Sequence, residues 1–145
     1  MLFKRISRTA AETVFVVVKN VSGGTLTGGY SCVWDTSTAD GVRVTQNAAG
    51  TLTLFAGVAN ADIANNDYGL VQVFGYRSSA YIVYSSVSVV IGDSLGCYLS
   101  ANWGLARLAA GSAGSALGFA TAMEAVASST AVAHYTTAKV FLRAL

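Results

Sequence analysis

The sequence contains no proline and very little charge. Asp, Glu, Lys and Arg make up 11% of its 145 residues, whereas an average soluble domain carries about 25%. Hydrophobic residues make up 53%. A lone domain of this composition must cover itself with neutral residues or hide part of its surface against partners. We favour the second arrangement, and the composition therefore predicts a protein that packs against copies of itself and a larger assembly.

Long apolar runs are missing as well. A membrane-spanning helix needs about 20 predominantly apolar residues, and the longest uncharged stretch after Arg107, residues 108–123, is mostly Ala, Gly and Ser. We therefore expect no membrane association. The basic first residues are followed by neither an apolar core nor a cleavage site, so we also expect no secretory signal.

Cysteine and histidine are too few for a disulfide framework or a metal site. Cys32 and Cys97 belong to no Cys-x-x-Cys pair, and both have apolar neighbours. We expect buried free thiols, which fit assembly in a reducing host cytoplasm. A structural zinc site needs four ligands, and these cysteines with the single histidine, His134, provide three at unrelated spacings. We expect no metal and no cofactor.

One segment carries the letters of a catalytic motif. Residues 92–96 (GDSLG) match both the Gly-x-Ser-x-Gly nucleophile elbow and the tetrapeptide of the GDSL hydrolases. An elbow needs a helix after its serine, whereas residues 97–99 continue as β-type sequence. Those hydrolases also place Asp three residues before their histidine, where this chain has Ala131 before His134. We expect a β-turn and no enzyme, with a small serine hydrolase using Ser94 and His134 as the alternative.

Short runs of β-branched and aromatic residues alternate with Gly, Ser and Asn along the chain, which is typical of strands and turns. No period of 3.6 residues persists, although 104–110 allows one short helix. The only internal echo is GTLT at 24–27 and again at 50–53, which is too short to indicate a repeat. The runs predict about nine or ten strands, including 14–19, 30–34, 42–45, 52–58, 68–76, 81–91, 95–99, 117–123 and 139–143.

This pattern predicts an all-β fold, mainly antiparallel, arranged as a small β-sandwich or barrel. We expect residues 1–12 to form an extended N-terminal arm and residues 13–145 to form a single β-rich domain. The arm is basic, because Lys4, Arg5 and Arg8 precede the first acid, Glu12. A nucleic-acid-binding face would instead need basic residues clustered on a folded surface, so we expect no specific nucleic acid.

Aromatic side chains are the candidate contact residues. A small domain can bury only some of its aromatic residues, and those left exposed serve as interface anchors. We expect Trp34, Phe74, Tyr76 and Trp103 to contribute to interfaces. A carbohydrate-binding β-module, with Trp34 or Trp103 as a sugar platform, is the alternative use of such residues.

Several segments resemble, in their order, the small structural proteins of tailed bacteriophages. The most distinctive is 65–76 (NNDYGLVQVFGY); the others are 14–23, 40–41, 91–95, 117–124 and 139–142. The resemblance implies a capsid decoration or cement protein that binds the outside of an icosahedral head, often as a trimer.

In such proteins the N-terminal arm orders on the shell, which assigns Lys4, Arg5 and Arg8 to contacts with the major capsid protein. The expected location is the capsid surface of the virion, after assembly in the host cytoplasm. The alternative within this group is a tail, connector or head-fibre component.

Overall fold

The computed structural model describes residues 12–38, 40–47, 51–84, 87–98, 103–108, 118–127 and 134–144. Over these ranges the chain forms nine strands and no helix, which confirms the all-β expectation. None of the described segments is a helix that could span a membrane. The strands are β1 (Val14–Asn20), β2 (Ser31–Trp34), β3 (Arg43–Thr45), β4 (Phe55–Ala59), β5 (Tyr68–Tyr84), β6 (Ser94–Cys97), β7 (Leu105–Arg107), β8 (Ala120–Ala122) and β9 (His134–Arg143).

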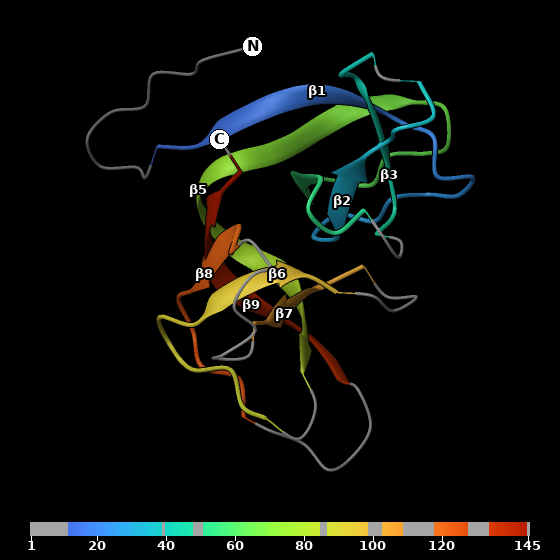
Figure 1. Cartoon of the computed structure of the whole chain (residues 1–145). Helices are drawn as coiled ribbons and strands as arrows, with labels where there is room; N and C mark the ends of the chain where they lie inside the picture. The colour runs from blue at the N-terminus through green and yellow to red at the C-terminus, as the bar shows by residue number, and fades with distance from the viewer. Residues whose placement is uncertain are drawn as a thin grey trace.

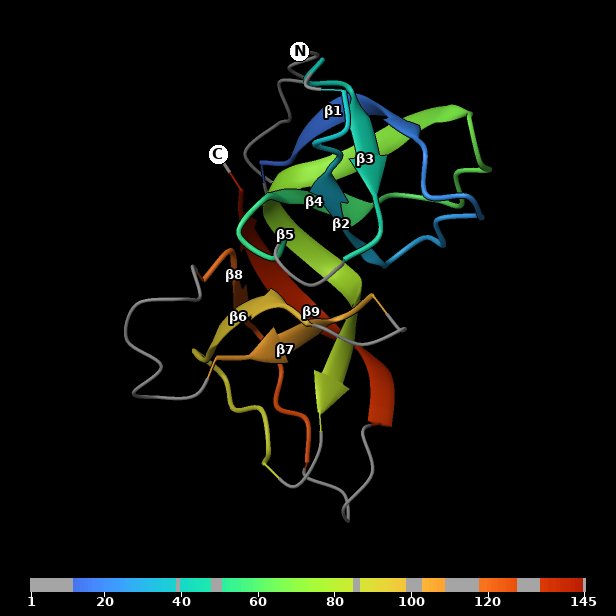
Figure 2. The same cartoon turned by 45° about the vertical axis from the view of Figure 1, so that its right-hand side comes forward.

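The strands form one sheet that closes on itself twice. Its order is β1-β3-β2-β4-β5-β7-β6-β8-β9, and β5 pairs in addition with both β1 and β9. The first part of β5 thus closes a five-strand ring with β1 to β4, and its second part closes another with β6 to β9. We call these the N-ring and the C-ring. Figures 1 and 2 show the two rings one above the other, with β5 running through both. Each described strand thus pairs with a neighbour on both sides over at least part of its length.

The two rings repeat the same topology. Strands β1 to β5 of the N-ring correspond in order to β5 to β9 of the C-ring, and the parallel pair β1–β3 corresponds to the parallel pair β5–β7. All other pairings are antiparallel in both rings. The isolated bridge between Leu26 and Ile63 recurs 63 residues later between Val89 and Val126.

The register is repeated as well. Ser31 lies opposite Val58 in the β2–β4 pair, and Ser94 lies opposite Thr121 in the β6–β8 pair, again 63 residues later. The chain is therefore a tandem structural repeat in which one long strand is common to both units.

The turns before β2 and β6 are equivalent in the same way. Gly29 and Gly92 have φ values of 93° and 94°, a left-handed conformation that glycine adopts without steric cost. The Gly29 N–H donates to the Ala59 carbonyl at 2.8 Å, and the Gly92 N–H donates to the Ala122 carbonyl at 2.9 Å. The GTLT echo at 24–27 and 50–53 is thus not the repeat that the fold contains.

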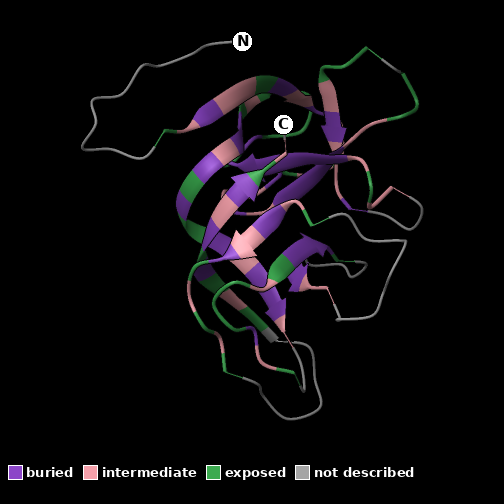
Figure 3. Cartoon of the chain, turned by 60° about the vertical axis from the view of Figure 1, so that its left-hand side comes forward, coloured by how far each residue is buried: buried purple, intermediate pink, exposed green. Residues whose placement is uncertain are grey.

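The buried side chains form two hydrophobic clusters, one in the N-ring and one that fills the C-ring and extends to Val33, Phe55 and Val58 of the N-ring. Side chains alternate along β5, so Val71 and Val73 are buried in the first cluster, and Ala80 and Ile82 in the second. Figure 3 shows buried and exposed residues alternating on the strands. The C-ring core also includes Leu95.

Two sequence predictions are corrected here. Residues 68–76 and 81–91 are not separate strands, because β5 runs unbroken through Tyr68–Tyr84 and ends well before Ile91. Residues 104–110 do not begin a helix: Leu105 pairs with Ile82 and with Cys97, so pairing on two sides makes Leu105–Arg107 a strand. The bend predicted at 85–86 lies outside the described residues. In both corrections tertiary pairing outweighs local sequence preference.

Candidate interaction surfaces

Ser94 and His134, the residues of the hydrolase alternative, are held apart by strand register. Ser94 pairs with Thr121 of β8, which pairs with Phe141 of β9. His134 opens β9, where it pairs with Tyr84. It precedes Phe141 by seven residues, or roughly 20 Å of strand at about 3.3 Å per residue. The strand register therefore does not bring the two residues together.

The segment 92–96 joins the end of a turn to the start of a strand. The Asp93 carboxylate accepts a hydrogen bond from the Val90 N–H at 2.8 Å, and its Oδ2 lies 2.9 Å from Nε of Arg107 in an ion pair. Ser94 then opens a strand and is not followed by the helix that a nucleophile elbow requires. The predicted β-turn is confirmed.

The four aromatic residues predicted at interfaces differ in their surroundings. Tyr76 is 36% exposed, whereas Trp34 and Phe74 pack against the N-ring core. Trp103 contacts the ring of Tyr30 edge-on at a centroid distance of 5.3 Å. Their role at an interface stays a prediction. The three basic residues predicted to contact a capsid, Lys4, Arg5 and Arg8, lie outside the described residues.

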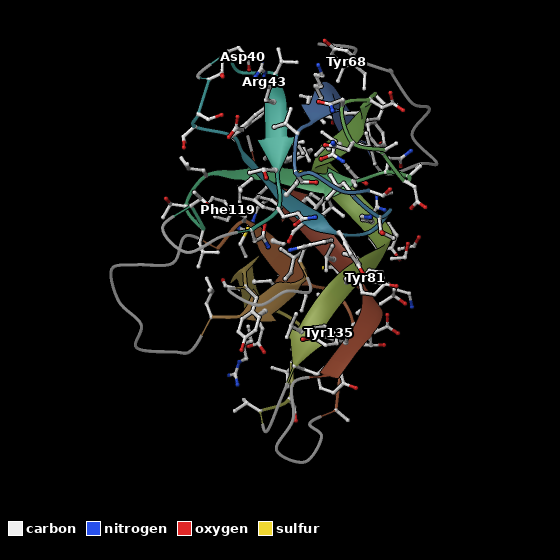
Figure 4. The ribbon with its side chains drawn as sticks, turned by 90° about the vertical axis from the view of Figure 1, so that its right-hand side faces the viewer. Asp40, Arg43, Tyr68, Tyr81, Phe119 and Tyr135 are labelled. Carbon is white, nitrogen blue, oxygen red and sulfur yellow. The ribbon has the colours of Figure 1, made fainter. Side chains whose placement is uncertain are left out.

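The most exposed apolar side chains of the N-ring lie together on β1 and β5. Val17 is 60% exposed, Tyr68 65% and Leu70 41%. Val17 pairs directly with Leu70, and Lys19 pairs with Tyr68, so the side chains share the outer face of two neighbouring strands. Figure 4 shows Tyr68 at the end of the molecule that also carries Asp40. We call Val17, Tyr68 and Leu70 the strand patch.

The C-ring exposes a second apolar group at its turns. Ile91 is 67% exposed, Val90 49% and Met123 44%. The hydrogen bond from the Gly92 N–H to the Ala122 carbonyl holds the 90–93 turn beside the end of β8, where Met123 follows. We call Val90, Ile91 and Met123 the turn patch.

The repeat provides an internal control for the turn patch, because the same backbone occurs in both rings. Its N-ring counterparts, 63 residues earlier, are Thr27, Gly28 and Asn60, which contain no large apolar side chain. The fold therefore does not require apolar residues on this surface.

The residues that correspond to the strand patch in the other ring are also polar. Lys19 opposite Tyr68 in the N-ring corresponds to Tyr81 opposite Thr137 in the C-ring. This alignment puts Ser79, Thr137 and Lys139 at the places of Val17, Tyr68 and Leu70. Each ring thus exposes apolar side chains where the other ring is polar, and exposed apolar groups of this kind mark contact sites.

Part of the charge on the described surface forms local ion pairs. Arg43 and Asp40 lie 2.9 Å apart, and Lys139 and Glu124 lie 3.7 Å apart (Figure 4 shows the first pair). The pKa of Asp40 is lowered chiefly because its carboxylate accepts a hydrogen bond from the Val42 N–H. The hydrogen bonds and the positive charge of Arg43 lower it further. These pairs fix turns and neighbouring strands and add no broad field of one sign.

The sequence analysis did not find the two patches. Residues 14–19 look like a uniformly buried strand, yet Val17 points outward while Val18 is fully buried. Ile91 was expected to end a strand, although it lies in a turn. Aligning the chain with itself at a spacing of 63 residues would have separated the turn patch from its polar counterparts, whereas the counterparts of the strand patch lie at other spacings that only the strand pairing shows.

Comparisons with known proteins give a likeness in fold. No family model matches the chain, and no curated protein matches it. Among solved structures, the chain is similar to the N base of the head fibre protein gp8.5 of bacteriophage phi29, with a TM-score of 0.53 and 13% sequence identity. The match covers 91% of this chain and 95% of that one. At this identity the comparison shows a common fold, and because it spans nearly the whole length, both rings take part in it.

Proposed function

We propose that the chain is a structural protein of a tailed-phage virion that lies on the outside of the head, self-associates and binds the major capsid protein. The observation that carries this proposal is the fold, which nearly the whole chain has in common with the base of a phage head fibre. Two apolar patches that the fold does not require support a role in assembly. An enzymatic activity plays no part in the proposal.

Two forms of this role differ in copy number. A decoration protein, most simply a trimer, covers the head in hundreds of copies and stabilises the shell by many modest contacts. A head-fibre base occupies fewer sites and carries a projecting fibre. The fold likeness favours the fibre base, and the low surface charge suits both.

The test uses purified chain and shells of the phage that encodes it. We expect bound copies at regular sites on the head in electron-microscopic reconstructions. A higher disruption temperature of the shells would identify a decoration protein, and attachment without this effect a fibre base. A chain that stays unbound, or is found only on the tail or connector, would contradict the proposal.

Self-association is tested on the strand patch. The double variant Val17→Thr and Leu70→Thr removes apolar surface from two exposed strand positions and is expected to shift the sedimenting species from oligomer to monomer. The matched control, Thr137→Ser, changes the equivalent face of the C-ring and should leave the mass unchanged. If the double variant keeps the wild-type mass, the strand patch is not the contact between copies.

A further inference from the structure

A buried cation lies where the two rings meet. Arg77 is 9% exposed and stands at an irregularity of the β5–β9 pairing, where the register shifts before Ala80. Its guanidinium donates to the Ala59 carbonyl at 2.8 Å, to the Ser79 carbonyl at 2.8 Å and to Oε1 of Gln72 at 3.5 Å. All three acceptors are neutral groups.

The charge of Arg77 has no counterion among the described residues. The ion pairs there involve Arg43, Arg107 and Lys139. Burial lowers the pKa of Arg77, and no nearby carboxylate opposes that effect. A guanidinium has five N–H donors, and Arg77 directs three hydrogen bonds at protein acceptors. Burying a cation without an opposite charge is costly, so an anion that reached this group would be favoured.

A polar hollow gives access to this group. Its volume is about 270 Å³, and Arg77 contributes to its wall. The other lining residues carry neutral amides and hydroxyls, and several of them are exposed, so the hollow opens to solvent. They are Asn60, Gln72, Tyr76, Ser78 and Ser79.

The repeat indicates that the fold does not require a cation at this position. The β5–β9 pair of Arg77 with Val140 corresponds to the β1–β5 pair of Val16 with Val71, so Val16 stands at the position of Arg77. The alignment that matches Tyr68 with Thr137 places Phe141 of β9 at the position of Gln72. Both counterparts are apolar, so the polar pair of Arg77 and Gln72 is a particular feature of this junction.

We propose that this hollow, the Arg77 hollow, binds a carboxylate group. The fork of a guanidinium matches the two oxygens of a carboxylate, and its single positive charge matches the single negative charge. The Nε2 group of Gln72 already donates to backbone carbonyls, so the Asn60 amide and the hydroxyls of the lining residues would complete the hydrogen bonding. A doubly charged phosphate would require a second cation, and the other lining residues are all neutral.

The test follows the Nε–H resonance of Arg77 by NMR in the full chain. Sodium acetate is expected to shift this resonance along a saturating curve, whereas sodium chloride at equal ionic strength should not. Inorganic phosphate is expected to bind more weakly than acetate. A linear response to acetate, an equal response to chloride, or tighter binding of phosphate would overturn the assignment.

Variants keep the test independent of folding. Arg77→Met should abolish acetate binding but also removes hydrogen bonds to two carbonyls, so Tyr76→Phe and Ser78→Ala provide a second route. Each removes one hydroxyl from the hollow and should weaken acetate binding by about fivefold. Thr25→Ala, at an exposed position outside the hollow, is the control and should bind as the wild type does. Unchanged binding in both hydroxyl variants would refute the proposed hollow.

A blocked glutamate, acetylated at its N-terminus and amidated at its C-terminus, separates two sources of the carboxylate. Binding of both acetate and the blocked glutamate indicates that a side chain of another protein fits, and binding of acetate alone indicates a small organic acid. The measurement needs no shell and no oligomer. Its failure would therefore leave the proposed virion role standing.

Discussion

Burial controls the chemistry of the two cysteines. Cys32 and Cys97 are free thiols inside the protein, as the sequence predicted. Burial raises the pKa of Cys97 to about 12, although a hydrogen bond with Ser31 opposes the shift. The pKa of Cys32 is raised by the same cause. Both side chains therefore remain protonated near neutral pH and act as small apolar groups.

The raised pKa of Cys97 predicts how the free energy of unfolding depends on pH. A cysteine thiol in an unfolded chain has a pKa of about 8.5. In the folded chain the pKa of Cys97 is about 12, so this thiol stays protonated to higher pH. The stabilisation is complete below the lower value and is lost as pH rises between the two, because the unfolded state then binds fewer protons. Cys97 should contribute a fall of about 1.4 kcal/mol per pH unit to the free energy of unfolding.

Urea unfolding of wild type and Cys97→Ala over this pH range measures the effect. The variant should lose stability less steeply with pH, while the remaining tyrosines, lysines and Cys32 titrate alike in both proteins. Parallel curves would contradict the assignment.

At the scale of elements, β5 passes from one ring to the other at Gly75. This residue has a φ of 98°, and a Cβ built on it would overlap the carbonyl oxygen of Glu12, the residue two positions before β1. Only glycine allows both the left-handed conformation and this close approach of two backbones. The bend in β5 and the start of β1 are therefore fixed together.

Replacing Gly75 should disrupt the close approach between the bend in β5 and the chain just before β1. Gly75→Ala is expected to destabilise the chain by about 3 kcal/mol, because it adds both backbone strain and a steric overlap. Gly24→Ala is the control, since a Cβ there would meet no atom within 4 Å. Chemical denaturation compares the two variants, and equal stabilities would show that the crossing tolerates a side chain.

At the scale of the whole molecule, the two rings cannot separate without losing a strand. β5 closes both rings, and its pairing with β9 is the longest in the sheet. The C-terminal Ala144 N–H also donates to the Val73 carbonyl at 2.8 Å and so ties the last strand to the N-ring part of β5. Both connections predict that the rings unfold together.

Matched leucines test this coupling. Leu26 in the N-ring and Leu95 in the C-ring are both fully buried, and replacing either by Ala should cost about 2 to 5 kcal/mol. We expect one calorimetric transition in the wild type and in both variants, shifted to lower temperature in each. Hydrogen exchange should accelerate in both rings, whichever leucine is replaced. Separate transitions for the two rings would contradict a common folding unit.

The prediction of single features from the sequence succeeded where the chemistry is local. The chain turns at Gly41 and Gly92, where the Asp-Gly and Gly-Asp pairs of the sequence indicate turns, and both glycines have positive φ values. Asn66 also has a positive φ value, within the Asn- and Asp-rich stretch 60–67. Strand β1 begins at Val14 as expected, because a run of β-branched residues favours extended backbone wherever it pairs. For the candidate surfaces, the low charge of the sequence predicted that the protein makes contacts, but it did not predict which residues make them.

By itself, the sequence determined the all-β class, the main turns, the buried thiols and the shortage of charge, since each depends on residue type and near neighbours. The tertiary structure decided the rest. It joined two predicted strands into β5 and made β7 a strand where the sequence allowed a short helix. It also made one repeat from halves that agree at few positions, such as Gly29 with Gly92 and Ala59 with Ala122. Many apolar residues fill equivalent core positions equally well, so only pairing in space reveals the repeat and the surfaces on which its halves differ.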